Sequence, residues 1–384
     1  MKPFRCWIIG RILLIVLPLL AMALFGCSKK QPETKEIKIG AILPMTGDAA
    51  KYGKWITNGM EIAIGELNAQ GGIGGKRVIL RVQDSKTNPA EGLSAFRQLV
   101  QTEKPAIVMT TLTGVCRAII PVAEEKHVIV FANSTFPGIT ENRRFIFRNM
   151  TNLSSDIPMA VEYVSNKLGK PDVAVIWRND DFGLWGSKKF NELYTVTGGK
   201  IVASESYDPD TQDFRTIITK VAANQPKLVY LLGYSEVGTI AWQAVELGHK
   251  WQYLGITTMG DPEALKLAGG ALDGAMHTEP ASALASSAPR VVAYREKYRQ
   301  KYGEDPEVWS ATFYDAVKIF ALAAQRCNLV SVEALRDELL KVKDYMGVSG
   351  RTSFLPNGDV LKPVELHQIK GGQSVPLAQG SEGK

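Results

Sequence analysis

The amino-acid sequence predicts an α/β fold in which two doubly wound parallel sheets form two lobes. Segments of strand and helix length alternate along residues 37–131, and a second alternating run occupies residues 154–255. The expected strands are nearly continuous apolar runs, which is typical of parallel sheets covered by helices on both faces. The chain has 384 residues and is 45% hydrophobic, which is enough for two cores.

The first run begins with a strand over residues 37–43 and continues into an amphipathic helix that Gly71 and Gly72 end. The apolar residues of this helix recur at intervals of three and four, as one face of a 3.6-residue period requires: Ile56, Met60, Ile64 and Leu67. The remaining expected strands are 77–84, 106–110 and 128–131, and the remaining expected helices are 89–103 and 115–126.

The second run begins with a helix over 154–168 and ends with a strand over 253–255. Between them we expect strands at 173–177, 201–207 and 228–232, and helices at 186–196, 214–223 and 237–247. After Thr278 the pattern changes to helices, at 290–302, 310–324 and 332–340. A hairpin with its turn at 356–359 follows, and residues 373–384 are expected to form a flexible tail.

The first 26 residues have the features of an export signal. A basic start precedes an apolar stretch over 12–25, which is shorter than the roughly 20 residues that span a bilayer. The stretch ends in Leu24-Phe25-Gly26-Cys27, which resembles the bacterial lipobox, so cleavage would leave Cys27 as a lipidated N-terminus. An uncleaved anchor helix is the alternative. Polar residues 27–36 are expected to form a tether, and the rest of the chain is expected outside the cytoplasm.

Charge and cysteine content exclude some partners. The formal net charge is +6 and falls to +3 without the leader, because residues 1–26 carry Lys2, Arg5, Arg11 and no acid. No dense basic block remains, so nucleic acid is not an expected partner. Cys116 and Cys327 are expected to be buried free thiols, although the sequence leaves their pairing open.

Five motifs together carry a family resemblance. They are residues 39–47 with Tyr52-Gly53, residues 67–76, residues 84–89, Phe313-Tyr314-Asp315-Ala316, and residues 350–354. On these motifs the chain resembles the leucine/isoleucine/valine-binding family of periplasmic proteins, which has the type I periplasmic-binding-protein fold. The resemblance extends from Ile37 to about Gly372.

The resemblance implies an extracytoplasmic solute-binding protein of an ABC importer. Its two lobes would be joined by a three-crossover hinge and would close around a small molecule, which is then passed to permease and ATPase subunits. It implies a first lobe of residues 37–152 plus 281–343 and a second lobe of 153–280 plus 344–372. The protein would be periplasmic, attached to the envelope membrane through lipid, and would need no cofactor.

Two loops after expected strands are candidates for a carboxylate site. Thr113 lies where a helix begins, and a hydroxyl beside free helix N–H groups can bind an anion. The alternative is that Thr113 only caps its own helix. The resemblance implies that a backbone carbonyl around Asn133 and the hydroxyl of Thr135 face the ligand, whereas a turn rich in Asn and Ser also forms for its own sake.

Three aromatic residues in loops after strands are candidates for the walls of the cleft. The resemblance places Tyr52, Phe182 and Tyr234 at ligand-contacting positions. An isolated aromatic residue is more often part of a core. Trp185 is a weaker candidate, since it could equally pack on its own helix.

One departure from the family pattern bears on the ligand. Thr257 occupies the position where amino-acid binders of this family carry a Glu for the ligand's ammonium group, and Leu153 replaces a nearby Asp. An unpaired buried ammonium is costly, so either another acid substitutes or the ligand has no ammonium. Asp156 could reach the cleft, or could only stabilise the start of its helix. We therefore favour a small apolar or aromatic carboxylate slightly over a branched-chain amino acid.

Catalysis and ligand sensing are the two alternatives to solute binding. Gly233-Tyr234-Ser235-Glu236-Val237 lies in the context of a hydrolase nucleophile elbow, but Val237 is too large for that turn. The glycine run at 71–76 has the wrong spacing for a phosphate loop, and no metal motif occurs. Catalysis and metal binding are therefore not expected. A ligand-sensing receptor subunit of the same fold remains the alternative function.

Overall fold

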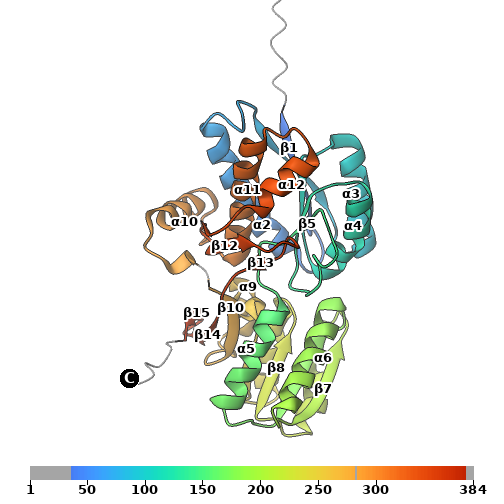
Figure 1. The fold of residues 1–384 in the computed structure, drawn as a ribbon. Coiled ribbons are helices and arrows are strands. Elements are labelled where there is room, and N and C mark those ends of the chain that lie inside the picture. The colour runs from blue at the N-terminus through green and yellow to red at the C-terminus, as the bar shows by residue number, and fades with distance from the viewer. Residues whose placement is uncertain (1–35, 282, 378–384) are drawn as a thin grey trace, which may run out of the picture. The chain divides into compact units, whose positions relative to one another are not determined.

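A computed structural model describes residues 36–281 and 283–377 (Figure 1). The predicted leader (1–26), the predicted lipidated residue Cys27 and nearly all of the expected tether (27–36) lie outside these residues. Strands of the described chain form two large sheets and a smaller three-stranded one. We call each large sheet with the helices packed on it a lobe.

The sheet of the first lobe is parallel throughout, in the order β2-β1-β3-β4-β5. Its strands are β1 (Ile37–Leu43), β2 (Val78–Asp84), β3 (Ile107–Thr111), β4 (Val130–Asn133) and β5 (Ile146–Phe147). Neighbouring residues of β1 enter opposite cores, with Ala41 on one face and Ile42 on the other. Both faces are therefore buried, as the continuous apolar runs predict.

Helices from distant parts of the chain cover the first sheet. One face packs on α2 (Ala50–Ala69) and on the C-terminal helices α10 (Pro289–Tyr302), α11 (Val308–Cys327) and α12 (Val332–Leu340). The other face packs on α3 (Pro89–Glu103) and α4 (Thr113–Glu125). Cys116 is buried in α4, Cys327 is half-buried at the end of α11, and both are free thiols.

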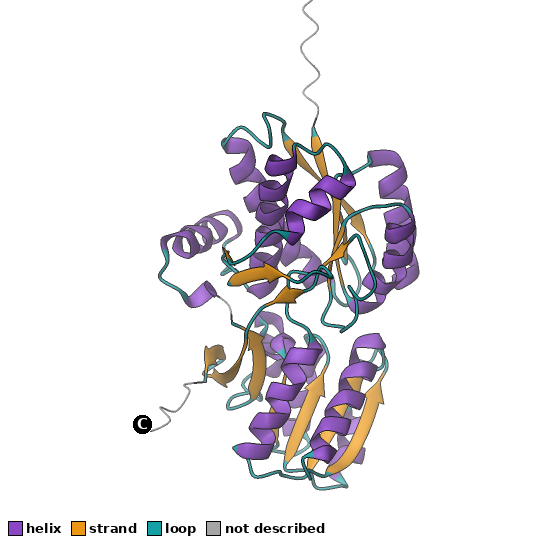
Figure 2. Ribbon diagram, viewed as in Figure 1, coloured by secondary structure: helices purple, strands orange, loops and turns teal. Residues whose placement is uncertain are grey.

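The sheet of the second lobe has the order β15-β14-β10-β9-β8-β6-β7. Strands β6 (Val173–Arg178), β7 (Ile201–Tyr207), β8 (Leu228–Leu232), β9 (Gln252–Gly255) and β10 (Met276–Pro280) are parallel, whereas β14 (Val364–Lys370) and β15 (Gln373–Pro376) add an antiparallel edge. Helices α5 (Leu153–Asn166) and α6 (Asp181–Val196) cover one face, and α7 (Arg215–Ala222), α8 (Glu236–Glu246) and α9 (Pro262–Ala268) cover the other (Figure 2).

The described chain passes between the two sheets three times. The crossings lie between β5 and α5, between β10 and α10, and between β13 (Val360–Leu361) and β14 (Figure 1). Two short 3-10 helices, Thr257–Gly260 and Ala283–Ala285, complete the elements. No helix within the described residues has the length and apolarity needed to cross a membrane.

The C-terminal segment differs from the expected division. The small sheet contains β11 (Tyr345–Met346), β12 (Arg351–Phe354) and β13 (Val360–Leu361). Phe354 packs against Phe131 and Phe147, with ring centroids 5.9 and 5.3 Å away, so this sheet contacts the core of the first lobe. We expected 344–372 in the second lobe, but only β14 and β15 pair with that sheet. Residues 373–376 also form a strand, where a flexible tail was expected.

Helices α4 and α6 both begin earlier than expected, and both lead to the site. Helix α6 begins at Asp181 rather than at 186, because the Asp180 carboxylate accepts a hydrogen bond from the Gly183 N–H and caps it. Phe182 therefore lies in the first turn of a helix and not in a loop, and Tyr52 likewise lies in the first turn of α2 and not in the expected loop. Helix α4 begins at Thr113 rather than at 115, directly after Leu112, whose φ of 68° turns the chain sharply.

Candidate functional site

A cavity lies where strands of both sheets end. It is lined by Thr111, Leu112, Thr113, Asn133, Ser134, Thr135, Phe182, Tyr234, Ile256, Thr258 and Trp309. Its volume is about 20 Å³, which is room for about one water. Admission of a larger molecule therefore requires the surrounding groups to move apart. Ligands of open α/β sheets bind at this end of the strands.

Five of the seven predicted site residues line this cavity. They are Thr113, Asn133 and Thr135 from the first lobe, and Phe182 and Tyr234 from the second. The other two lie just behind it. Tyr52 contacts Tyr234 and Trp309, with ring centroids 5.8 and 5.1 Å away. Thr257 is adjacent in sequence to two lining residues, and its hydroxyl donates to the backbone carbonyl of Thr278 over 3.4 Å.

The first-lobe wall is polar but uncharged. The hydroxyl oxygens of Thr113 and Ser134 are 2.9 Å apart. The Asn133 side chain accepts from the Asn149 N–H through Oδ1, but its Nδ2 has no partner although the residue is fully buried. Thr113 also opens α4, whose first N–H groups have no carbonyl partner within the helix. This wall therefore offers N–H and O–H donors, which suit an anion.

The second-lobe wall is aromatic. The rings of Phe182 and Tyr234 stack with centroids 5.8 Å apart and planes 14° from parallel. Trp309 faces them from the first lobe, at the start of α11. The helix expected over 310–324 begins one residue after Trp309. Trp309 joins the site only through tertiary packing. The other lining residues that sequence reasoning missed, Thr111, Leu112, Ser134, Ile256 and Thr258, adjoin predicted ones or lie within two residues of one.

Asp261 is a buried acid that contacts Trp309 of the cavity wall. It is 3% exposed and accepts hydrogen bonds from the Tyr52 hydroxyl (2.8 Å) and the Trp309 indole N–H (3.3 Å). Burial and the neighbouring Glu307 raise the pKa of Asp261 well above its usual range. No ion pair joins it to a basic side chain among the described residues. Sequence reasoning overlooked Asp261, although it follows Thr257 by only four residues.

Asp156 does not line the cavity. It is buried in the first turn of α5, as one of the two interpretations of the sequence expected. Burial raises its pKa to about 7, although Thr278 and Arg148 oppose the shift. Its Oδ1 atom has no hydrogen-bond partner. Trp185 contacts Phe136 of the first lobe, with ring centroids 6.2 Å apart, and lies outside the cavity.

The fold has two lobes built on mainly parallel sheets, with a cavity where strands of both sheets end. The family model "Periplasmic binding protein" matches residues 36–373. This chain therefore belongs to the periplasmic binding protein family, whose members are named for an extracytoplasmic location. The predicted family and the predicted fold class, the type I periplasmic-binding-protein fold, are both confirmed.

Three relatives illustrate the similarity. The Leu/Ile/Val-binding protein BraC3 of Rhizobium johnstonii is 24% identical over 351 residues, covering 88% of this chain and 93% of the relative. The structure of the branched-chain amino acid transporter substrate binding protein LivJ from Streptococcus pneumoniae, in complex with isoleucine, is 28% identical with a TM-score of 0.81, covering 89% of this chain and 100% of that one. The structure of a solute binding protein of an ABC transporter from R. palustris, in complex with benzoate, is 20% identical with a TM-score of 0.80. The match covers 89% of this chain and 95% of that one.

Proposed function

We propose that this protein is the solute-binding component of an ABC importer and captures a small carboxylate, either an amino acid or an aromatic or aliphatic acid. The supporting observation is the cavity at the strand ends, where hydroxyl and N–H donors of one lobe face aromatic rings of the other. The names of its relatives describe binding and transport, so we propose that the protein is not an enzyme.

The proposed mechanism is closure of the two lobes. Thr113, Asn133 and Thr135 bind the carboxylate on the first lobe while the site is open. Phe182 and Tyr234 then cover the ligand, with Tyr52 and Thr257 supporting this wall from behind. The ligand selects the closed form because only that form surrounds it on both sides. Permease subunits would recognise the closed lobes.

Asp261 gives the amino-acid alternative a specific basis. An ammonium group needs a counter-charge when buried, and Thr257 offers none. Asp261 touches Trp309 of the cavity wall and could supply that charge after a small rearrangement. A ligand without an ammonium would leave Asp261 with only its present partners, the Tyr52 hydroxyl and the Trp309 indole.

A ligand screen tests this proposal. Thermal-shift measurements of the purified chain against the common amino acids, benzoate and short aliphatic acids should reveal at least one stabilising carboxylate, which calorimetry then quantifies. Asp261→Asn should abolish binding of an amino acid but leave a plain acid nearly unaffected. If no carboxylate stabilises the chain, or if the chain converts one of them to a product, the proposed function is wrong.

Attachment to the membrane is a separate part of the proposal. We propose that residues 1–26 are cleaved and that Cys27 carries lipid. Mass spectrometry of the protein from membranes of an expressing cell should find an N-terminal peptide beginning at acylated Cys27. A Cys27→Ala chain should appear in the soluble extract instead. An N-terminus at Met1, or unmodified Cys27, would contradict this part alone.

A further inference from the structure

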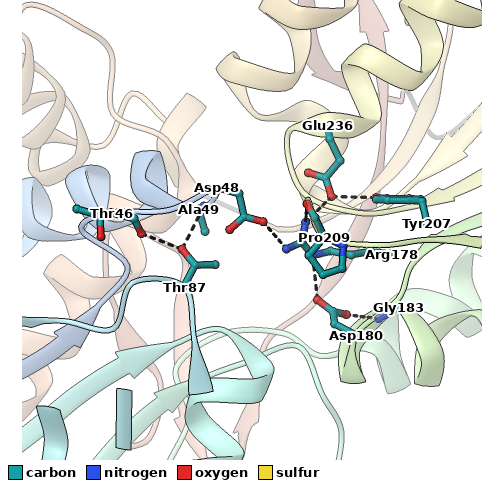
Figure 3. Close-up of polar contacts among 10 residues, drawn as sticks. All are labelled: Thr46, Asp48, Ala49, Thr87, Arg178, Asp180, Gly183, Tyr207, Pro209 and Glu236. Carbon is teal, nitrogen blue, oxygen red and sulfur yellow. Dashed lines mark hydrogen bonds and ion pairs between the residues drawn. The ribbon is translucent and has the colours of Figure 1, made fainter. Parts of the chain in front are cut away.

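A buried arginine stands behind the aromatic wall of the cavity. Arg178, the last residue of β6, has a side chain that is only 4% exposed. Its Nε donates to Asp180 and its Nη1 to Glu236, each over 3.1 Å, and its Nη2 pairs with Asp48 (Figure 3). Asp180 and Glu236 belong to the second lobe, like Arg178 itself. Asp48 alone comes from the first lobe.

The loop that carries Asp48 is held in place from within the first lobe. The Thr87 hydroxyl accepts from the Ala49 N–H over 3.3 Å and donates to the Thr46 carbonyl over 3.0 Å, so it bridges the loop on both sides of Asp48 (Figure 3). Gly47 has a φ of 89°, and a Cβ there would lie 2.6 Å from the Thr87 hydroxyl. The loop is therefore fixed before Asp48 meets its partner.

Three carboxylates around one guanidinium need further positive charge, and helix ends supply it. Asp48 lies just before α2, Asp180 caps α6, and Glu236 is the first residue of α8. Each carboxylate thus lies at a helix N-terminus, which carries a partial positive charge. Glu236 also accepts from the Tyr207 hydroxyl over 2.9 Å. Asp48 can therefore join the cluster despite its two acidic neighbours.

Arg178 connects this cluster to the ligand cavity. Its guanidinium carbon lies 4.7 Å from the centroid of the Tyr234 ring, and Tyr234 lines the cavity and stacks on Phe182. Burial disfavours the charged guanidinium, but attraction by Tyr234, Glu236 and Asp48 prevails and raises the pKa of Arg178. A permanent cation therefore lies against the outer face of the aromatic wall.

We propose that the Asp48–Arg178 pair is an interlobe latch, which makes Asp48 a positioning residue for ligand binding although it touches no ligand. The pair can form only when the first and second lobes meet, so its free energy adds to closure and not to the folding of either lobe alone. This inference rests on the proposed function. The latch acts through Arg178 on Tyr234, and thereby holds the wall against the bound molecule.

Among the residues that the structure describes, the other ion pairs between the lobes have more exposed basic partners than Arg178. Arg117 and Asp181 are 2.6 Å apart with side chains 48% and 41% exposed, and Lys51 and Glu263 are 3.9 Å apart with side chains 38% and 29% exposed. Exposed pairs contribute little because water screens them. Asp48 and Glu263 are similarly exposed, at 32% and 29%, but the Arg178 side chain is 4% exposed whereas that of Lys51 is 38% exposed. Loss of Glu263 should therefore affect closure much less than loss of Asp48, which makes Glu263→Gln a matched control.

Binding measurements on three variants test the latch. Isoleucine and benzoate are the probes, and whichever binds the wild-type chain is titrated by calorimetry against Asp48→Asn, Asp48→Glu and Glu263→Gln. We expect about tenfold weaker binding for Asp48→Asn, through faster dissociation. Asp48→Glu keeps the charge and should restore binding to within about twofold of wild type, where Glu263→Gln should also remain.

The remaining outcomes separate the latch from the proposed function. Unchanged binding by Asp48→Asn, a loss that Asp48→Glu does not restore, or an equal loss in Glu263→Gln would overturn the latch while leaving solute binding intact. If neither probe binds the wild-type chain, small-angle X-ray scattering of the unliganded proteins decides. The latch then predicts a larger radius of gyration for Asp48→Asn than for wild type and Asp48→Glu, and equal radii overturn it.

Discussion

Thr113 carries the proposed recognition of the carboxylate at the level of a single residue. Its hydroxyl is buried beside that of Ser134 and stands at the N-terminus of α4. Neither hydroxyl has a charged neighbour among the residues lining the cavity. Recognition of an anion would therefore depend on hydrogen bonds from neutral donors and on the helix end, in surroundings that exclude water.

We predict that Thr113→Val weakens carboxylate binding by about 1.5–3 kcal/mol, because a charge-assisted hydrogen bond is lost while side-chain volume is kept. Calorimetry with the best ligand measures the change. Thr219→Val is the control, since Thr219 is exposed on α7 and its hydroxyl bonds only to the Arg215 carbonyl of its own helix. Equal affinity in the wild type and Thr113→Val would remove Thr113 from the site.

Asp156 should make stability depend on pH. Its pKa is raised to about 7 in the folded chain by burial, against an ordinary value of 3.8. Between these values the folded state binds more protons than the unfolded state, so stability falls as pH rises from about 4 to about 7. Asp156→Asn removes this titration and should flatten that decline in urea unfolding curves. Asp210→Asn serves as the control, because the Asp210 side chain is exposed to solvent. An equally steep decline in Asp156→Asn would contradict the assignment.

Helix α3 shows how local signals fix an element. Asn88 has extended backbone angles, and its side chain accepts from the N–H groups of Ala90 and Glu91, while Pro89 occupies the first helical position. We predict that Asn88→Ala lowers the free energy of unfolding by about 1 kcal/mol, because two helix N–H groups lose their acceptor. Urea denaturation measures it, with exposed Asn224→Ala as the control. A loss no greater than that of the control would show that the cap is dispensable.

Elements with strong local signals were predictable from the sequence. The bounds of α3, β7, β8 and α12 agree with expectation, because caps, turns and apolar runs mark their ends. The start of α6 was missed by five residues. Gly183 weakens a helical pattern, yet here it lies so close to the Arg178 carbonyl that a Cβ would approach within 2.0 Å. Only the folded chain shows this close approach.

Site residues at the ends of strands were predictable from the sequence. Site residues that reach the cavity through packing of distant segments were not. Thr113, Asn133 and Thr135 lie at or just after the C-terminal ends of strands of the first lobe, so topology alone places them at one edge. Trp309 reaches the cavity from α11, about two hundred residues further along the chain. The strand β15 was missed for a related reason: Gln373–Pro376 has no apolar pattern and is ordered by pairing with β14.

At the scale of the whole described chain, contacts between the lobes surround the cavity. The Tyr52–Asp261 hydrogen bond and the Asp48–Arg178 pair join residues more than one hundred positions apart. Both would break if the lobes separated, whereas the cores of the two lobes would remain intact, because their buried clusters are distinct. The proposed closure would thus proceed without unfolding either lobe.

A crystal structure of the chain with its tightest carboxylate ligand tests the central claim most directly. We predict that the ligand lies between the lobes, with its carboxylate within hydrogen-bond distance of the Thr113 hydroxyl and the first N–H groups of α4, and with Tyr234 and Phe182 against its other side. A ligand bound elsewhere on the surface, with the present cavity unchanged at about 20 Å³, would contradict the account.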